Sequence, residues 1–316
     1  MTDCAVIIPA YNAAAYLEQA IASALGQTTP VTLLVVDDGS TDATPEICAK
    51  YGSALRLLRQ SNQGVSVARN AGAAASEAEW LLFLDADDRL LRDAVERLLL
   101  RARESSSGVC YGQTVYFDEV TGARRTHGHG ASEGPPPAGA HGSFWKSAIT
   151  TPGAALIRRS LFAEVGGFDP AVNSLADRDF WLKAGVLAPF AFVNAPVIEK
   201  REHGDNMSGN LNRALFQAAV VQLGFLDWCA ARQIDTSFLE TNPPAIIDNV
   251  LRKSFETRSL GAIRDLLTLA EQQNLSTPLL PEARRYVSLT PTAADLRLRL
   301  RAARQRISRL FGKGDQ

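Results

Sequence analysis

The chain has 316 residues and a formal net charge of −1 at pH 7, with 46% hydrophobic and 21% charged residues. These values are ordinary for one large globular domain, or one domain with an appendage, and the near-zero charge excludes a general attraction to nucleic acid. Four cysteines, at positions 4, 48, 110 and 229, lie far apart with no paired ligand spacing, so we expect reduced thiols and not a disulfide framework or a zinc site. Strand-like sequence begins close to the N-terminus, and no uninterrupted apolar segment is long enough to span a bilayer. We therefore expect a soluble, cytoplasmic protein.

Strands and helices alternate through the first hundred or so residues. Short apolar runs predict the strands, and apolar residues at spacings of three and four predict the helices between them. The expected strands are residues 5–8, 31–36, 55–58 and 80–84, and the expected helices are 16–25, 44–51 and 65–75. This alternation predicts right-handed crossovers and a parallel sheet with helices on both faces.

The last of these strands runs directly into three carboxylates, those of Asp85, Asp87 and Asp88. The carboxyl ends of parallel strands meet at the ligand-binding edge of such a sheet, where the polar segments after all four strands should converge. Clustered negative charges raise the electrostatic energy of the fold unless a cation lies among them, and hard divalent ions prefer such oxygen ligands. The cluster suggests a metal–diphosphate site, although on this motif alone a solvated turn is an equally good interpretation.

Taken in order, four segments resemble those of glycosyltransferase family 2, which has the nucleotide-diphospho-sugar-binding GT-A fold. They are VIIPAYN at 6–12, VVDDGSTD at 35–42, NQGVSVARNAG at 62–72 and DADD at 85–88. Four motifs in this order, each after an expected strand, are far more specific than any one alone. The resemblance implies an α/β fold with a Rossmann-like, mostly parallel sheet flanked by helices and followed by a helical C-terminal extension. We place the catalytic domain at 1–210 and the extension at 211–316.

The resemblance also assigns a nucleotide-sugar site to this edge. It implies that Pro9 and Tyr11 lie against a uracil-like base and that Asp38 accepts a hydrogen bond from the ring N–H. A carboxylate there would repel a base that presents an acceptor. Asn62 and Arg69 would complete the site. From the residues alone, Asp38 could instead cap the following helix, and Arg69 could be a surface ion-pair partner of little energetic weight.

Within the acidic cluster, the resemblance gives the residues different roles. Asp85 would contact the ribose hydroxyls, and Asp87 would coordinate Mn²⁺ or Mg²⁺ bridging the two phosphates. No role follows for Asp88. Downstream, residues 200–208 resemble a segment that closes over the donor phosphates, in which His203 could be a further metal ligand or contact the diphosphate and Arg201 could neutralise it. A plain loop histidine is an equal alternative for His203.

Sugar transfer also needs a base for the acceptor. As the sugar becomes oxocarbenium-like, charge grows on the leaving diphosphate, where a divalent cation stabilises it, while the acceptor hydroxyl loses its proton on the opposite face. In the family the base precedes a Trp-containing helix, and LADRDFWLK at 175–183 places Asp177 there, giving an inverting single displacement. The chain departs from the family at Ala176, where Glu is common. Asp179 is the second candidate, with an exposed helix carboxylate as its alternative interpretation.

Three other segments carry weaker signals. Residues 121–143 are rich in Gly and Pro and include His127, His129 and His141, which predicts a long mobile loop that could cover the site, with metal binding there disfavoured. Apolar residues at helical spacing predict helices at 211–232 and 244–273. A basic amphipathic helix at 295–311 could lie on an anionic membrane, or pack on the protein or on another subunit.

We therefore expect an inverting, metal-dependent glycosyltransferase of polysaccharide biosynthesis that acts in the cytoplasm, at the inner face of the membrane if the basic helix binds lipid. It would move a hexosyl or N-acetylhexosaminyl group from a nucleotide sugar, UDP-linked by preference, to a hydroxyl of a glycan or lipid-linked saccharide. A catalytically inactive nucleotide-sugar-binding scaffold is the alternative, favoured by Ala176 and opposed by Asp87 and Asp177. Nucleotidyl transfer would require a Gly-rich, basic N-terminal loop, which residues 9–12 do not supply.

Overall fold

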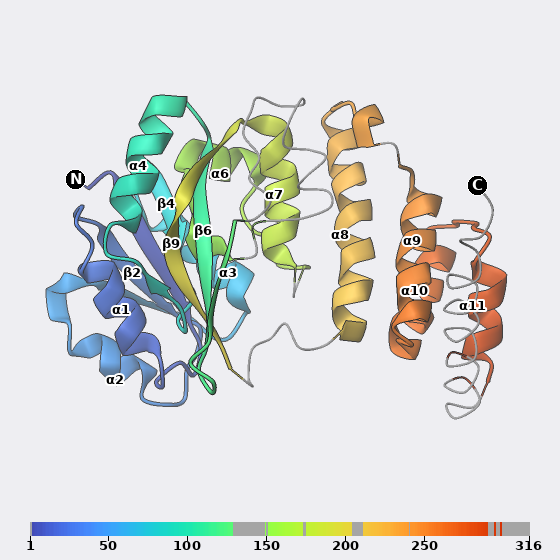
Figure 1. Cartoon of the computed structure of the whole chain (residues 1–316), viewed down its shortest axis with the longest axis horizontal. Helices are drawn as coiled ribbons and strands as arrows, with labels where there is room; N and C mark the ends of the chain where they lie inside the picture. The colour runs from blue at the N-terminus through green and yellow to red at the C-terminus, as the bar shows by residue number, and fades with distance from the viewer. Residues whose placement is uncertain are drawn as a thin grey trace. The chain divides into compact units, whose positions relative to one another are not determined.

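A computed structural model describes residues 2–128, 149, 151–172, 175–203, 211–239, 241–289, 294 and 298. The chain divides into two compact units, residues 1–206 and 207–316. The first unit is a sheet with helices packed against it, and the second is helical (Figure 1).

Within the described residues, nine strands form one sheet in the order β3-β2-β1-β4-β8-β6-β9-β5, with β7 paired to β6. Their bounds are β1 Cys4–Ala10, β2 Thr32–Asp37, β3 Arg56–Arg59, β4 Trp80–Phe83, β5 Arg89–Leu90, β6 Val109–Asp118, β7 Arg124–His127, β8 Ala155–Arg158 and β9 Phe190–Glu202. The first four strands pair in parallel, as the strand–helix alternation predicts. Beyond β4 the sheet is mixed, since β8 runs antiparallel to β4 and β6 while β9 runs parallel to β6.

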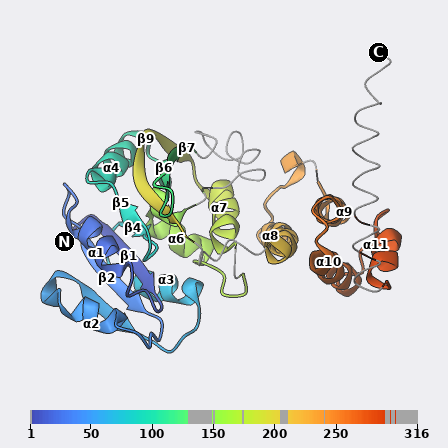
Figure 2. The same cartoon turned by 60° about the horizontal axis from the view of Figure 1, so that its bottom comes forward.

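Helices cover both faces of this sheet (Figure 2). Those of the first unit are α1 Leu17–Leu25, α2 Thr44–Ala49, α3 Val65–Ala74, α4 Ala94–Ser105, α6 Arg159–Val165 and α7 Ala176–Leu187, with short 3₁₀ helices η1 Gly52–Ala54 and η2 Pro152–Ala154. Every residue of β1 and β4 is buried, as expected of central strands with both faces covered. The α/β fold with flanking helices is therefore confirmed.

Two packing features hold helices α3, α6 and α7 against the sheet. A Cβ atom on Gly72 would lie only 2.4 Å from Cγ2 of Ile7, so the glycine lets α3 approach β1 closely. On the same face, four phenylalanines from β4, α6, α7 and the intervening turn pack with ring centroids 5.1–5.6 Å apart; they are Phe83, Phe162, Phe168 and Phe180. This cluster anchors α6 and α7 to the sheet.

The second unit contains α8 Leu211–Ala231, η4 Ser237–Leu239, α9 Pro243–Glu256, α10 Leu260–Gln272 and α11 Leu280–Val287. The helical segment expected at 244–273 is divided into two helices, α9 and α10. The chain turns between α9 and α10, where Arg258 has a φ of 58°, outside the range of a right-handed helix.

Helix α8 agrees with the helix expected at 211–232. Residues 212–231 form a helix with mean hydropathy 1.4, long and apolar enough to cross a membrane, with 33% of its apolar window buried. Polar residues interrupt this helix, so it is not an uninterrupted apolar run of the kind considered from the sequence. A core helix of a soluble protein meets the same test, so length and composition alone do not indicate membrane insertion.

Two expectations fall wholly or partly outside the described residues. The predicted loop at 121–143 begins instead with β7, which pairs with β6, and its part from 129 onward, with His129 and His141, is not described. The basic helix expected at 295–311 lies outside the description except for Leu298, which is buried.

Candidate active site

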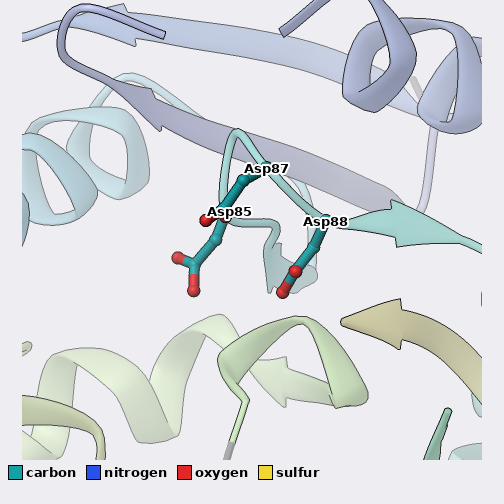
Figure 3. A group of neighbouring side chains, drawn as sticks. All are labelled: Asp85, Asp87 and Asp88. Atoms are coloured by element: carbon teal, nitrogen blue, oxygen red, sulfur yellow. The ribbon is translucent and has the colours of Figure 1, made fainter. Parts of the chain in front are cut away.

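The three aspartates after β4 lie on one tight turn (Figure 3). The turn is closed by the Asp88 N–H, which donates to the carbonyl of Asp85 at 3.1 Å. One carboxylate oxygen from each of Asp85, Asp87 and Asp88 lies within 4.8 Å of the others. Three oxygen donors at this separation fit a hard divalent cation.

Asp88 has the clearest structural signature of the three. It is 2% exposed, and its Oδ1 accepts a hydrogen bond from the backbone N–H of Arg201 at 3.0 Å. Its Oδ2 is buried and has no hydrogen-bond partner among the described residues. Burial, reinforced by Asp85 and Asp87, raises the pKa of Asp88 well above its usual range. Asp88 thus ties the acidic turn to β9 and leaves one buried oxygen that a cation would satisfy, a role the sequence did not indicate.

His203 lies beside Asp87. Its Nε2 is 3.1 Å from Oδ2 of Asp87, and its ring centroid is 4.9 Å from that of Tyr16. The His203 side chain is 12% exposed and that of Asp87 is 31% exposed. The structure therefore brings His203 to the acidic turn, which favours a role at the site over a plain loop histidine.

Asp85 pairs with Arg69. Nη2 of Arg69 lies 2.5 Å from Oδ1 of Asp85, and the guanidinium carbon lies 5.1 Å from the ring centroid of Phe168. Arg69 is 6% exposed, so the interpretation of a weak surface ion pair is wrong. The Arg69 Nε is buried without a hydrogen-bond partner in the described part of the chain.

The residue after Arg69 holds the segment that leads to α7. The Asn70 side chain accepts from the Phe168 N–H at 2.9 Å and donates to the Phe168 carbonyl at 2.8 Å. Gly167 at this turn has a φ of +76°, and a Cβ there would lie 2.7 Å from Oδ1 of Asn70, so glycine is required. One turn of α3 therefore positions both Arg69, on the donor side, and the segment around Phe168 that leads to α7.

Asp38 organises the loop between β3 and α3. It is 3% exposed, and it accepts hydrogen bonds from the Gln60 side chain at 2.7 Å, from the Gln63 N–H at 2.9 Å and from the Gly64 N–H at 2.8 Å. The alternative that Asp38 caps the following helix is wrong, because Asp42 instead accepts from the backbone N–H of Thr44 at the start of α2. Asp38 therefore holds the loop that carries Asn62, which is exposed.

Pro9 and Tyr11 are the two residues expected to lie against the base, and of these only Tyr11 is exposed. Tyr11 is 53% exposed just after β1, whereas Pro9 is buried within that strand. An exposed aromatic ring at the carboxyl end of β1 offers the flat apolar face that a nucleobase needs.

Asp177 occupies the first turn of α7 and is partly buried. Burial raises its pKa, and the positive charges of Arg69 and Lys200 act in the opposite direction. Asp85 also raises the pKa of Asp177, so the expected acceptor base and the donor-side carboxylate interact electrostatically. The structure thus brings Asp177 to the same region as Asp85 and Arg69.

Lys200 is a residue of this site to which the sequence analysis assigned no role. Burial alone would lower its pKa, but the carboxylates of Asp88, Asp85 and Asp177 outweigh burial and raise it. A lysine on β9 therefore offsets the charge of both the donor-side and acceptor-side carboxylates. The signal for Lys200 in the sequence was its place next to Arg201, in the segment at 200–208 that resembles one of the family.

Asp179 and Arg201 have other partners than those expected. Asp179 is 2% exposed and lies 2.7 Å from Nζ of Lys183, so the exposed-carboxylate interpretation is wrong. Burial raises the pKa of Asp179, and Lys183 opposes that shift. The three guanidinium nitrogens of Arg201 each donate to protein oxygens, of Glu119, Gln19 and Asp87, so in this structure they are engaged and not turned toward a diphosphate.

Comparison with known proteins places this geometry in context. A family model described as glycosyl transferase family 2 matches residues 5–166, about half of the chain. The chain is 29% identical over 211 residues to a chondroitin synthase of Pasteurella multocida, covering 64% of this chain and 21% of that protein. It is 32% identical over 122 residues to glycosyltransferase GlyG of Streptococcus pneumoniae, covering 37% of this chain and 40% of that protein. The chain thus matches well under half the length of these relatives.

Solved structures show the same fold. TarS 1-349 of S. aureus covers 94% of this chain and 88% of its own length, with a TM-score of 0.64 and 20% identity. TarS 1-349 has also been solved in complex with UDP-GlcNAc, and that structure matches with a TM-score of 0.60 at 20% identity. At this identity the likeness supports the fold.

Proposed function

The chain belongs to glycosyl transferase family 2, and we propose that it is an inverting, metal-dependent transferase that moves a sugar from a UDP-linked donor to an acceptor hydroxyl. Glycosyl transfer from a nucleotide sugar follows from the family. The observation that carries the finer proposal is the convergence of three pairs of residues. Asp87 and His203 lie in contact, as do Asp85 and Arg69, while Asp177 and Lys200 interact electrostatically.

The donor assignment rests on the edge formed by β1 and β2. The exposed ring of Tyr11 would lie against the base, next to the end of β1 in which Pro9 is buried. Asp38 would accept from a ring N–H, since its Oδ2 receives one hydrogen bond in the structure and a carboxylate oxygen can accept two. Asn62, in the loop that Asp38 holds, would complete the nucleotide site with Arg69. The complex of TarS with UDP-GlcNAc supports a UDP-sugar as donor.

The residues at the acidic turn fit a divalent cation. Asp87 and His203 would hold Mn²⁺ or Mg²⁺, with the buried Oδ2 of Asp88 nearby and in need of a partner. When bound, such an ion stabilises a diphosphate leaving group as a Lewis acid. Asp85, held by Arg69, would face the ribose hydroxyls.

The chain supplies the base from the other side of the site. Asp177 would take the proton of the acceptor hydroxyl as that oxygen attacks the anomeric carbon. Because burial raises its pKa, Asp177 is a stronger base than an exposed aspartate, and the positive charges of Arg69 and Lys200 favour its ionised form by opposing that shift. Attack opposite the leaving group in a single displacement inverts the anomeric carbon.

The proposal also covers the acceptor, the domain boundaries and the cellular location. A chondroitin synthase among the relatives supports a glycan or a lipid-linked saccharide as the acceptor. We assign catalysis to residues 1–210 and leave 211–316 as a helical extension. A cytoplasmic protein, bound at the inner face of an anionic membrane through residues 295–311, would meet such acceptors.

Incubation of the full chain with Mn²⁺ and a panel of UDP-, GDP- and dTDP-sugars, reading released nucleotide, tests this function. We expect release with one UDP-sugar, accelerated by a saccharide acceptor and abolished by EDTA. Tight nucleotide binding without turnover or hydrolysis of any donor would support the inactive scaffold instead. Turnover that persists in EDTA would remove the metal from the mechanism.

A further inference from the structure

Arg201 connects the acidic turn to three other elements. It is 6% exposed at the end of β9. Its backbone N–H donates to Oδ1 of Asp88 at 3.0 Å, and its Nε donates to the carbonyl oxygen of Asp87 at 3.2 Å. One residue thus holds two consecutive members of the acidic turn, one through its side chain and one through its backbone.

The two terminal nitrogens of the Arg201 guanidinium bind residues of two other elements. Nη1 donates to Oε1 of Glu119, in the turn between β6 and β7, at 2.9 Å, and Nη2 donates to Oε1 of Gln19 on α1 at 2.8 Å. Glu119 also accepts from the Tyr16 hydroxyl at 3.1 Å. The guanidinium carbon lies 4.8 Å from the ring centroid of Tyr16, the ring that His203 also contacts.

We propose that Arg201 is a positioning residue: it fixes the backbone of Asp87 so that the Asp87 carboxylate and His203 are set for metal binding, and Glu119 holds Arg201 in place. The inference rests on the proposed function, because it concerns the metal site of that function. It departs from the expectation that Arg201 neutralises the donor diphosphate.

The physical reason lies in the geometry of the turn. Residues 85–88 follow the end of β4, so no strand pairing fixes the Asp87 carbonyl, and its hydrogen bond from Arg201 takes over that task. Groups that orient metal ligands in this way change metal affinity by about 10–100-fold when removed. The guanidinium spreads its donors over three nitrogens in one rigid plane, whereas a lysine ammonium has all of its donors on a single nitrogen and cannot reproduce this arrangement.

The test measures Mn²⁺ affinity directly, by the electron paramagnetic resonance signal of free Mn²⁺ with and without UDP, in the full chain. We expect Arg201→Gln and Arg201→Lys each to weaken Mn²⁺ binding by about 10–100-fold. Glu119→Gln should weaken it by less, because Arg201 keeps its contacts to Asp87 and Gln19. With Mn²⁺ raised to saturation, the KM for the donor should return toward the wild-type value.

Arg124→Gln is the matched control. Arg124 belongs to the β6–β7 hairpin that also carries Glu119, and it pairs with Glu199. Its guanidinium lies over Phe117, 5.0 Å from the ring centroid, as that of Arg201 also does at 5.9 Å. Its partners Glu199 and Phe117 lie outside the acidic turn, so its loss should leave Mn²⁺ affinity unchanged.

Unchanged Mn²⁺ affinity in folded Arg201→Gln would overturn the inference while leaving the proposed function standing. A raised donor KM at unchanged Mn²⁺ affinity would also overturn it, and would return Arg201 to the diphosphate. If Arg201→Gln does not fold, Glu119→Gln carries the test, and equal Mn²⁺ affinity in Glu119→Gln and Arg124→Gln would then count against it. Absence of Mn²⁺ binding by the wild-type chain would overturn both the inference and the metal part of the function.

Discussion

Nε2 of His203 lies 3.1 Å from Oδ2 of Asp87, although the two residues are 116 positions apart. One residue follows β9 and the other lies in the turn after β4. The pair places an imidazole nitrogen beside the cluster of carboxylate oxygens, which is the mixed donor set that Mn²⁺ accepts more readily than Mg²⁺ does.

His203→Gln should therefore weaken the binding of Mn²⁺ more than the binding of Mg²⁺. We expect the concentration of Mn²⁺ needed for half-maximal turnover to rise about 10-fold or more, measured by titrating each metal at saturating donor. His127→Gln is the control, because His127 lies on β7 and its ring contacts Tyr116. Equal curves for His203→Gln and the wild type would remove His203 from the metal site.

Asp87→Asn should abolish metal-dependent turnover, because an amide oxygen carries no charge with which to hold a divalent cation. Released nucleotide measured across a Mn²⁺ titration checks this. Asp93→Asn is a matched control, since Asp93 is a half-buried carboxylate that pairs with Arg97 at the start of α4. Activity in Asp87→Asn with its Mn²⁺ dependence intact would show that the metal lies elsewhere.

Asp177→Asn should leave donor affinity nearly unchanged and reduce transfer by about 10²–10⁴-fold, because it removes the general base. Calorimetry with UDP and steady-state kinetics separate the two effects. An equal loss of donor affinity would move Asp177 into the nucleotide site. Asp179→Asn serves as the comparison: it should destabilise the fold by leaving Lys183 buried without its carboxylate, while the folded fraction keeps its kcat.

The pH dependence of kcat/KM should report the ionisation of Asp177. The base acts when ionised, so kcat/KM falls as pH decreases through the pKa of Asp177. Because burial raises that pKa, the acid limb should have its midpoint above about 3.9, the value of an exposed aspartate. Asp177→Asn should lose this limb. A wild-type midpoint at or below the exposed value would contradict the assignment.

The sequence predicted the features that depend on local periodicity. The apolar runs that became β1 and β4 and the helical spacing of α3 are set by neighbours within one or two turns, so they could be read along the chain. Convergence of Tyr11, Asp38 and Asp87 at one edge then followed from the rule for parallel strands. The antiparallel strand β8 could not be predicted in this way, because its partners are chosen by pairing across distant segments.

The partners of the polar residues were harder to predict for the same reason. Asp38 precedes a helix and has the local pattern of a cap. Its carboxylate oxygens instead accept hydrogen bonds from backbone N–H groups about 25 positions further along the chain. Asp88 resembles any turn aspartate until β9 brings the Arg201 N–H to it. The local sequence indicates which side chains can accept hydrogen bonds. The packing of distant strands decides which donors those side chains meet.

Asp38→Ala should destabilise the protein by about 2–4 kcal/mol, because the N–H groups of Gln63 and Gly64 lose a charged acceptor in a part-buried loop. Chemical denaturation followed by circular dichroism measures this. Asp38→Asn keeps an acceptor oxygen and should lose less stability, yet it should relax discrimination among nucleotide bases if the proposed base contact exists. Unchanged base preference in a folded Asp38→Asn would leave Asp38 with a structural role alone.

Asp88→Asn should stabilise the metal-free protein at neutral pH. The pKa of Asp88 in the fold is raised above its value of about 3.9 in the unfolded chain, so the folded state retains the proton to higher pH. Stability of the wild type therefore falls as pH rises from about 4 through the folded-state pKa, and the neutral asparagine lacks this loss. We expect the variant to melt about 2–4 °C higher at pH 7.5 in EDTA, with the difference vanishing near pH 4.

Added Mn²⁺ should reverse that order. A cation at the acidic turn favours the ionised form of Asp88 and binds only the folded state, so the wild type should gain more in Tm than Asp88→Asn does. Thermal unfolding with a Mn²⁺ series at pH 7.5 measures both gains. A variant that melts lower than the wild type in EDTA at both pH values would mean that the hydrogen bond from Arg201 to Asp88 outweighs the cost of its buried charge.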